Sequence, residues 1–381
     1  MLGLRANSRA TCPWYRAARR LKTYLLAFAG IFVFCATTAA AAPDTAQFRA
    51  LGEPALMVRD CAHVLLISIT RAGNRLVAGG ENGAIIYSDD NGQSWHQAVV
   101  PVSVTITTVA FATAKDGWAA GAYGVVLHTT DGGVTWVRQL DGIQVNQLQV
   151  DAATRFQTAN PASPAADTAV RRAGIFTQDG PDKPFLTILA SSPSDAMVFG
   201  GYRMCIRTDD GGASWNDCSL DIPDPVSHNL YDAIGTGSSV YLAGEAGDVF
   251  RSDDQGKTFT SLAPPASSTL FGIFGTHDAT LIAYGVSNGL FRSADQGKTW
   301  TSIPIDAQAD LTAGAVLESG TVVILSEAGG TFASMDDGQS FQMLSLNEGM
   351  ALYGIQQAAN GDVVLVGSDG VRVVPAADFV T

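Results

Sequence analysis

The chain has 381 residues, 40 of them glycine, and only 15% of its residues are charged. This length and composition suit one large, soluble all-β domain and are unlike a disordered or fibrous chain. The formal net charge of −13 disfavours contact with nucleic acid or with anionic lipid headgroups, so we expect no nucleic-acid partner.

The first 41 residues have the pattern of a signal peptide. Four basic residues precede an apolar run at 24–34, and Ala39 and Ala41 fit a signal-peptidase site that leaves Ala42 as the first mature residue. We therefore expect an exported protein of the periplasm or cell envelope. Residues 1–41 hold six basic residues and no acidic one, so the mature net charge becomes −19. The alternative is an uncleaved membrane anchor, although the apolar run is short for a span.

An eight-residue pattern, Ser/Thr-x-Asp-x-Gly-x-Ser/Thr-aromatic, occurs six times in the chain. Its aromatic residues are separated by steps of 41, 79, 44, 41 and 41 residues and lie at Trp95, Trp136, Trp215, Phe259, Trp300 and Phe341. A β-rich run with glycine-marked turns precedes each copy, which gives four short strands per unit. A period near 40 with four strands per unit predicts a β-propeller.

The residue types of this pattern are those of a tight hairpin turn. Aspartate bonds loop amides, glycine supplies a positive φ, and the hydroxyl residues satisfy further backbone groups. We expect the central aspartates to be structural: Asp90, Asp131, Asp210, Asp254, Asp295 and Asp336. The alternative, that they are catalytic or bind calcium, is weaker because no copy continues as a twelve-residue loop closed by glutamate.

The 79-residue step contains an insert at residues 141–184. It lacks the repeated pattern, and Val145, Leu148, Ala152 and Phe156 fall on one helical face. Prolines break this segment before a second stretch that can form a helix. We predict a small helical hairpin rather than a degenerate blade.

The last repeat, residues 352–376, supplies three strands and then stops. Residues 48–58 precede the first repeat and are a candidate for the missing outer strand, which would close the ring. The expected fold is therefore an all-β, seven-bladed propeller that covers residues 42–381.

Two cysteines flank the third copy of the pattern. Cys205 is three residues before Thr208, and Cys218 is three residues after Trp215. In a hairpin centred on that copy the two thiols face each other across neighbouring strands, and export permits oxidation. We predict a Cys205–Cys218 disulfide, which leaves Cys61 free.

The repeated pattern resembles the Asp-box, or BNR repeat, and further residues resemble one family that carries it. The segment DGWAAG at 116–121, Gly124, the box at 129–136 and GPDKPF at 180–185 are similar to the photosystem II stability/assembly factor family of seven-bladed propellers. This resemblance implies a non-enzymatic, exported assembly or stability factor. It also implies a protein client, often a membrane protein, and a lumenal location if the host is photosynthetic.

Many Asp-box proteins are glycoside hydrolases, so a glycan-active or glycan-binding protein is the alternative. A sialidase needs an arginine cluster and a Tyr–Glu nucleophile pair. Here the arginines are scattered, and Arg207, Arg251 and Arg292 recur at one place in the repeat, which blade architecture explains. The five histidines are widely spaced, and no glycine-rich phosphate loop leads into a helix. We predict no catalytic residue, no metal and no cofactor.

A binding surface is expected on the face opposite the Asp-box turns, where the insert emerges. The candidate residues on that face are Glu81, Tyr123, Tyr202, Arg203, His228 and Glu245. Tyrosine and arginine are enriched at binding hot spots. The insert would form one wall of a groove beside Tyr123, Tyr202 and Arg203 that takes a peptide or loop of a client. The propeller is expected to be a monomer.

Overall fold

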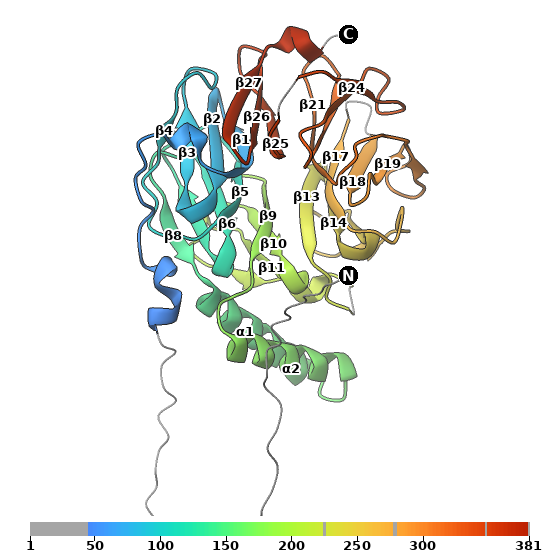
Figure 1. Cartoon of the computed structure of the whole chain (residues 1–381). Coiled ribbons are helices and arrows are strands. Elements are labelled where there is room, and N and C mark those ends of the chain that lie inside the picture. The colour runs from blue at the N-terminus through green and yellow to red at the C-terminus, as the bar shows by residue number, and fades with distance from the viewer. Residues whose placement is uncertain (1–44, 224–225, 277–279, 347–348, 380–381) are drawn as a thin grey trace, which may run out of the picture. The chain divides into compact units, whose positions relative to one another are not determined.

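The strands form seven antiparallel sheets arranged as the blades of a ring (Figure 1). The computed structural model describes residues 45–223, 226–276, 280–346 and 349–379. The expected signal peptide lies outside these residues. Within the described residues six sheets have four strands and the seventh has three. The predicted seven-bladed propeller is confirmed.

The strands follow one another through each blade from the centre of the ring outwards. Blades 1 and 2 contain β1 (Leu66–Ala72), β2 (Arg75–Gly80), β3 (Ile85–Ser88), β4 (His96–Gln97), β5 (Ile106–Phe111), β6 (Gly117–Gly121), β7 (Val126–Thr129) and β8 (Val137–Leu140). Blades 3 and 4 contain β9 (Phe185–Ala190), β10 (Ala196–Gly200), β11 (Cys205–Thr208), β12 (Asn216–Asp217), β13 (Leu230–Thr236), β14 (Ser239–Gly244), β15 (Val249–Ser252) and β16 (Thr260–Ser261).

The remaining blades repeat this order. Blades 5 and 6 contain β17 (Leu270–Gly275), β18 (Leu281–Gly285), β19 (Leu290–Ser293), β20 (Thr301–Ser302), β21 (Leu311–Val316), β22 (Val322–Ser326), β23 (Thr331–Ser334) and β24 (Gln342–Leu344). Blade 7 contains β25 (Leu352–Gln357), β26 (Val363–Gly367) and β27 (Gly370–Val374). The seven innermost strands contact one another in sequence, and β25 contacts β1, which completes the ring.

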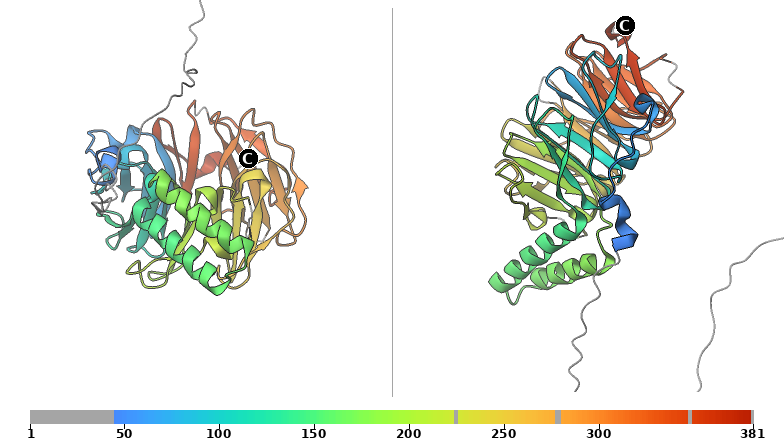
Figure 2. Two further views of the ribbon diagram at one scale, coloured as in Figure 1. Left: turned by 90° about the horizontal axis from the view of Figure 1, so that it is seen from below. Right: turned by 90° about the vertical axis from the view of Figure 1, so that its left-hand side faces the viewer.

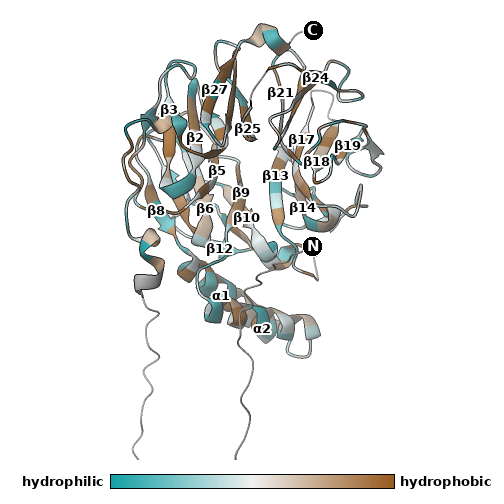
Figure 3. Ribbon diagram, in the orientation of Figure 1, coloured by the Kyte–Doolittle hydropathy of each residue, from teal (hydrophilic) through white to brown (hydrophobic). Residues whose placement is uncertain are grey.

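The hydrophobic core is divided among the spaces between adjacent blades. The second strand of a blade is covered on both faces by its neighbours, so it is buried along its length, as in β6, β10 and β22. Such strands read as continuous apolar runs instead of alternating ones. Trp118 of β6 and Phe199 of β10 are fully buried in this way. Figure 3 shows hydrophobic colour along the strands, whereas the two helices carry both kinds of residue.

Each Asp-box closes the turn between the third and fourth strands through the same hydrogen bonds. In blade 2 the Thr129 hydroxyl donates to Asp131 Oδ1 at 2.8 Å, and the Gly133 amide donates to Thr129 Oγ1 at 3.1 Å. Thr135 donates its amide to Oδ1 at 3.0 Å and its hydroxyl to Oδ2 at 2.6 Å. Both carboxylate oxygens of Asp131 are thus engaged within their own turn.

The other five boxes have equivalent bonds, and the pKa values reflect them. Hydrogen bonds from the hydroxyl and amide of Ser94, chiefly the hydroxyl, lower the pKa of Asp90 to about 2. The same kind of bonds, from Ser214, lower the pKa of Asp210 to about 2. These carboxylates are therefore ionised hydrogen-bond acceptors that hold hairpins together.

Arginines on the strands next to the boxes bind acidic partners within the blade architecture. Arg75 binds the Asp89 carboxylate through two nitrogens, at 2.7 and 2.9 Å, and reaches the Gly132 carbonyl in the next box at 3.0 Å. Arg292 likewise binds Asp337 of the following box at 2.7 Å. The ion pairs of the other two repeated arginines are Arg207–Asp221 and Arg251–Asp253. Arg75 and Arg292 thus link neighbouring blades.

The prediction that residues 48–58 form the outer strand of blade 7 is wrong. Residues Thr45–Leu51 form a 3₁₀ helix, and residues 54–58 have no regular structure. Their backbone bonds go to blade 1 and to the connection that follows it: Ala55 donates to the Val100 carbonyl at 3.0 Å. Pro54 has no amide to donate to a ladder, and Leu51 is buried against the valines of residues 100–104. The ring closes instead through contact between β1 and β25.

The insert at residues 141–184 forms two antiparallel helices, α1 (Gly142–Ala159) and α2 (Pro164–Asp179), which lie side by side at one edge of the propeller (Figure 2). The buried face of α1 runs through Val145, Gln149 and Ala153, whereas Leu148 and Phe156 are only half-buried. The buried face of α1 is therefore rotated from the expected apolar stripe and includes two polar residues, Asn146 and Gln149. Neither helix in the described part of the chain is long and apolar enough to span a membrane.

Candidate functional site

The turns between the second and third strands lie on the face that carries the helices. In blade 3 this turn holds Tyr202 and Arg203, whose φ angles are 56° and 59°. The position of Arg203 is glycine in blades 1, 2 and 4, as Gly83, Gly124 and Gly247. A left-handed backbone costs a residue other than glycine roughly 1–2 kcal/mol. Arg203 occupies this position against its backbone preference, which makes it a candidate functional residue.

Helix α1 is fixed to the turn of blade 2. Asp141 caps the helix by accepting from the Ile143 amide at 3.0 Å, and Gln144 accepts from the Asp141 amide at 3.0 Å. Gly142 is needed here because a Cβ atom would lie 2.7 Å from the Tyr123 carbonyl oxygen. The hairpin is therefore held rigidly against the ring at its first residue.

The end of helix α2 packs against the candidate turn of blade 3. Asn146 of α1 donates to the carbonyl oxygens of Phe176 and Gly180 at 2.9 and 3.0 Å, which joins the two helices. The Phe176 and Tyr202 rings meet edge to face, with centroids 5.5 Å apart. The buried ammonium group of Lys183 lies 5.1 Å from one ring centroid and 5.6 Å from the other. These contacts orient Tyr202 along the hairpin.

A groove of about 560 Å³ lies between the helical hairpin and the chain that leaves blade 3. Its walls are mainly apolar and include Phe156, Pro164, Ala165, Ala169, Leu220, Ile222 and Pro223. Two arginines also line it. Arg172 donates to the Ser227 hydroxyl at 3.0 Å, and Arg203 donates to the Ile222 carbonyl at 3.2 Å. The groove thus combines an apolar surface with guanidinium groups held on its walls.

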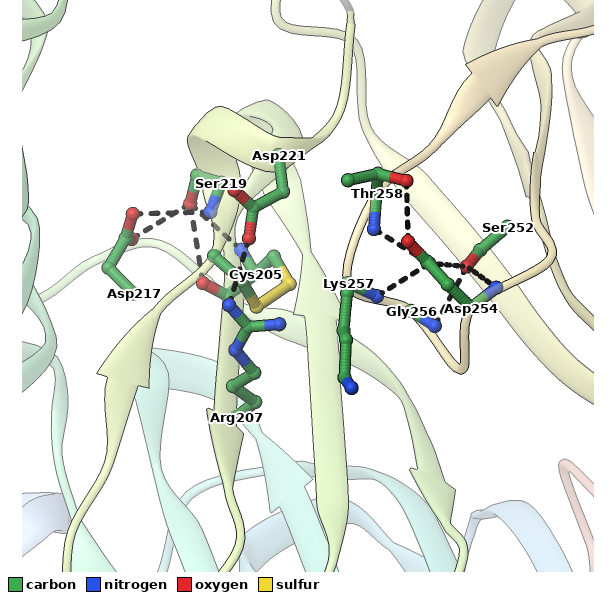
Figure 4. Close-up of polar contacts among 11 residues, drawn as sticks. Cys205, Arg207, Asp217, Ser219, Asp221, Ser252, Asp254, Gly256, Lys257 and Thr258 are labelled. Carbon is green, nitrogen blue, oxygen red and sulfur yellow. Dashed lines mark hydrogen bonds and ion pairs between the residues drawn. A yellow bond between two sulfur atoms is a disulfide. The ribbon is translucent and has the colours of Figure 1, made fainter. Parts of the chain in front are cut away.

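The wall formed by residues 219–222 is fixed by the hairpin below it (Figure 4). A disulfide joins Cys205 and Cys218, as the spacing around the third box predicts. Asp217 accepts from the amide and the hydroxyl of Ser219 at 3.1 and 2.8 Å, and burial raises the pKa of Asp217. Leu220 is therefore presented to the groove on a rigid support.

Four of the six predicted binding residues are brought together beside this groove. The Arg203 amide donates to the His228 carbonyl at 2.8 Å, and the Tyr202 amide donates to Asn229 Oδ1 at 2.9 Å. Glu245 Oε2 accepts from the Asn229 amide at 3.2 Å. Asn229 joins the turns of blades 3 and 4, although sequence analysis did not single it out.

The other two predicted residues lie elsewhere, so the expectation that Tyr123 borders the groove is wrong. Tyr123 packs against Phe48 of the N-terminal segment, with ring centroids 6.0 Å apart, in the cluster between blades 1 and 2. Glu81 lines a different pocket of about 580 Å³, beside Leu56 and Val58. The N-terminal segment, which was expected at blade 7, covers these positions.

Leu220, Ile222 and Gln149 also line the groove or the small cavity beside it, although their sequence context did not predict this. Leu220 and Ile222 alternate with polar residues just after an outer strand, a weak signal in a chain rich in such alternation. Gln149 is 5% exposed and faces a small cavity beside the groove, but no pattern in the sequence marks a buried amide. In the described ranges, no three or more His, Cys, Asp or Glu side chains gather as a metal site.

The sequence is similar to one protein family, to one repeat and to a curated protein. A family model described as photosynthesis system II assembly factor YCF48 matches residues 181–373, and a BNR/Asp-box repeat model matches residues 86–97. The photosystem II assembly lipoprotein Ycf48 of Synechococcus sp. (strain CC9902) is 39% identical over 77 residues. That match spans 20% of this chain and 23% of the relative, so less than a quarter of the relative's length is compared.

Solved structures share the fold at low sequence identity. YCF48 bound to a D1 peptide has a TM-score of 0.60 at 17% identity and covers 84% of this chain and 99% of its own. YCF48 from Cyanidioschyzon merolae has a TM-score of 0.57 at 16% identity and covers 81% and 95%. The WD40 propeller domain of Doa1, at 10% identity, has a TM-score of 0.58 with 85% and 96% covered.

Proposed function

We propose that this chain, which belongs to the photosynthesis system II assembly factor YCF48 family, is a non-enzymatic assembly factor that binds an extended segment of a membrane-protein client. The observation that carries this proposal is the groove between the helical hairpin and blade 3. The relative solved as YCF48 bound to a D1 peptide supports a peptide as the kind of ligand.

The chemistry of the groove favours a peptide over a glycan. Side chains of an extended peptide fill apolar pockets, and its backbone carbonyls accept from fixed donors. Phe156, Leu220 and Ile222 line the groove and can contact apolar side chains of a peptide. Arg172 and Arg203 on its walls can donate to the backbone carbonyls of the peptide. A glycan needs many polar partners, and the Asp-box carboxylates are already engaged in their own turns.

The location we propose is the exported side of a membrane, with the groove open to client segments that emerge there. The signal-peptide pattern of residues 1–41 supports export. The Synechococcus relative is a lipoprotein, which agrees with a protein that works beside a membrane. A client loop close to the lipid surface would then meet the groove without entering the bilayer.

The proposal is tested by filling the groove. Ala165 is exposed on α2 and lines the groove, so Ala165→Trp would occupy the space of a client side chain. Ala159→Trp is the matched control, because Ala159 is an exposed alanine at the end of α1 outside the groove. A photo-crosslinking residue at position 165 would first identify the client segment, and a synthetic peptide of that segment would be titrated by calorimetry.

A loss of peptide affinity of about tenfold or more is expected for Ala165→Trp, with the control unchanged. Arg203→Gly, which restores the residue found in three other blades, should also weaken binding while the melting temperature stays level or rises. Equal affinities for the wild type, Ala165→Trp and Arg203→Gly would place the client surface elsewhere and would refute the proposal.

A further inference from the structure

A central channel of about 290 Å³ is lined by the innermost strands of all seven blades. Each of these strands has a β-bulge at its second residue, and the bulged residues line the channel towards the face that carries the helices. Three of them are aromatic and half-buried: Tyr231, Phe271 and Tyr353. The Tyr231 and Phe271 rings meet edge to face, with centroids 5.3 Å apart.

Asp232 lies on the channel wall directly after the bulged Tyr231. Its Oδ1 accepts from its neighbour's amide, Ala233, at 2.9 Å, and its Oδ2 accepts from the Ile273 amide of the next blade at 3.0 Å. Asp232 is the one charged residue that lines the channel within the described ranges. No cation there offsets its charge, and burial raises its pKa to about 6.

The bridge to the next blade does not need a charge. At the equivalent place between blades 1 and 2, the neutral Ser68 hydroxyl accepts from the Val109 amide at 3.2 Å. A hydroxyl is therefore sufficient for the bond to the next blade. Asp232 also accepts from the Ala233 amide and, at 3.4 Å, from the Thr187 hydroxyl of the preceding blade, and none of these neutral donors compensates its charge. An uncompensated carboxylate that is half-buried, as Asp232 is, is unfavourable.

We propose that this channel binds a primary ammonium group, either on a lysine side chain of a partner or on a small alkylamine, with Asp232 as its counter-ion. The aromatic rim of Tyr231, Phe271 and Tyr353 would contact the methylene chain and contribute cation–π attraction. The Tyr284 side chain also lines the channel, because Gly272 leaves space for its hydroxyl where a Cβ atom would lie within 2.1 Å.

The geometry favours an ammonium group over the other cations that proteins recognise. A guanidinium binds a carboxylate best through both oxygens in one plane. Both Asp232 oxygens already accept backbone amides, and Oδ1 also accepts the Thr187 hydroxyl at 3.4 Å. A divalent metal needs several oxygen ligands, whereas a single carboxylate lines this channel. Asp232 lies one strand residue, about 3.3 Å, below the aromatic rim. An ammonium group on a flexible aliphatic chain can reach its carboxylate while the methylene groups contact the rim.

The test is a titration of the mature chain with n-butylammonium at pH 7.5, followed through the backbone NMR signals of Ala233 and Ile273. We expect saturable shifts of both amides, because each donates to Asp232. Asp232→Asn should abolish the shifts and still melt cooperatively. Ser68→Ala is the matched control, because it removes the equivalent neutral bridge and should leave the shifts intact. Neutral 1-butanol should give no saturable shift.

The two sources of the amine are separated by a second probe, Nα-acetyl-lysine methylamide. Tighter binding of this probe than of butylammonium supports a client lysine, and weaker binding supports a free alkylamine. The proposal does not rest on the groove, so it can fail while client binding survives. Absence of saturable shifts with both amines, or equal shifts in Asp232→Asn, would overturn it.

Discussion

Asp232→Asn should make the propeller more stable at neutral pH and leave it unchanged near pH 4. In the folded chain, burial raises the pKa of Asp232 to about 6, despite amides that favour the ionised form. In the unfolded chain an aspartate titrates near 3.9. Because the folded pKa is the higher one, the folded state holds the proton more tightly. The resulting stabilisation is fully present below about pH 4 and is lost as the pH rises through about 6.

The size of this effect follows from the two pKa values. Their difference corresponds to about 3 kcal/mol if the site were fully dry. The Asp232 side chain is partly exposed to solvent, so we expect about 1–2 kcal/mol at pH 8. For a domain of this size that is a rise in Tm of about 1–3 °C for the variant. At pH 4 the protonated Asp232 carboxyl of the wild type and the side-chain amide of Asp232→Asn are both neutral, and each has one carbonyl acceptor. The two proteins should therefore have the same Tm at pH 4.

Circular dichroism melts of the wild type and Asp232→Asn between pH 4 and pH 8 check this prediction. Ser68→Ala serves as the control, because its side chain does not titrate and its difference from the wild type should be independent of pH. A Tm difference between Asp232→Asn and the wild type that is flat across this range would refute the reasoning. So would a wild type that gains stability relative to the variant as the pH rises.

Three further predictions concern the frame of the propeller. Asp131→Ala should lower the free energy of unfolding by about 1–3 kcal/mol, whereas the control Thr130→Ala should be near neutral. Burial raises the pKa of Asp131, but the hydrogen bonds from its own turn outweigh burial and lower it overall. The stability difference between Asp131→Ala and the wild type, measured by urea titration, should therefore shrink below about pH 4. Cys205→Ser should cost about 3 kcal/mol, because the bridge spans 13 residues, and reductant should destabilise only the wild type. Arg75→Met, which removes an inter-blade link, should cost about 1 kcal/mol in the same titrations, and an unchanged midpoint would show that the link is not stabilising.

The sequence by itself determined the repeating unit, because the chemistry of each Asp-box is local. Thr129, Asp131, Gly133 and Thr135 lie within seven residues and satisfy one another without help from the rest of the chain. The Cys205–Cys218 pairing follows from the same hairpin register. Six such turns at a regular period leave little choice but a propeller.

Contacts between segments far apart in the chain were decided by the tertiary structure alone. Residues 48–58 have the composition of an edge strand, but burial of Leu51 between blades 1 and 2 holds them away from blade 7. The groove unites α2 with Leu220, Ile222, Pro223 and Ser227, which no local pattern connects to that helix. Asp232 reads as an ordinary polar residue of a strand. Only closure of the ring places its carboxylate on the wall of a narrow channel, and that loss of water raises its pKa.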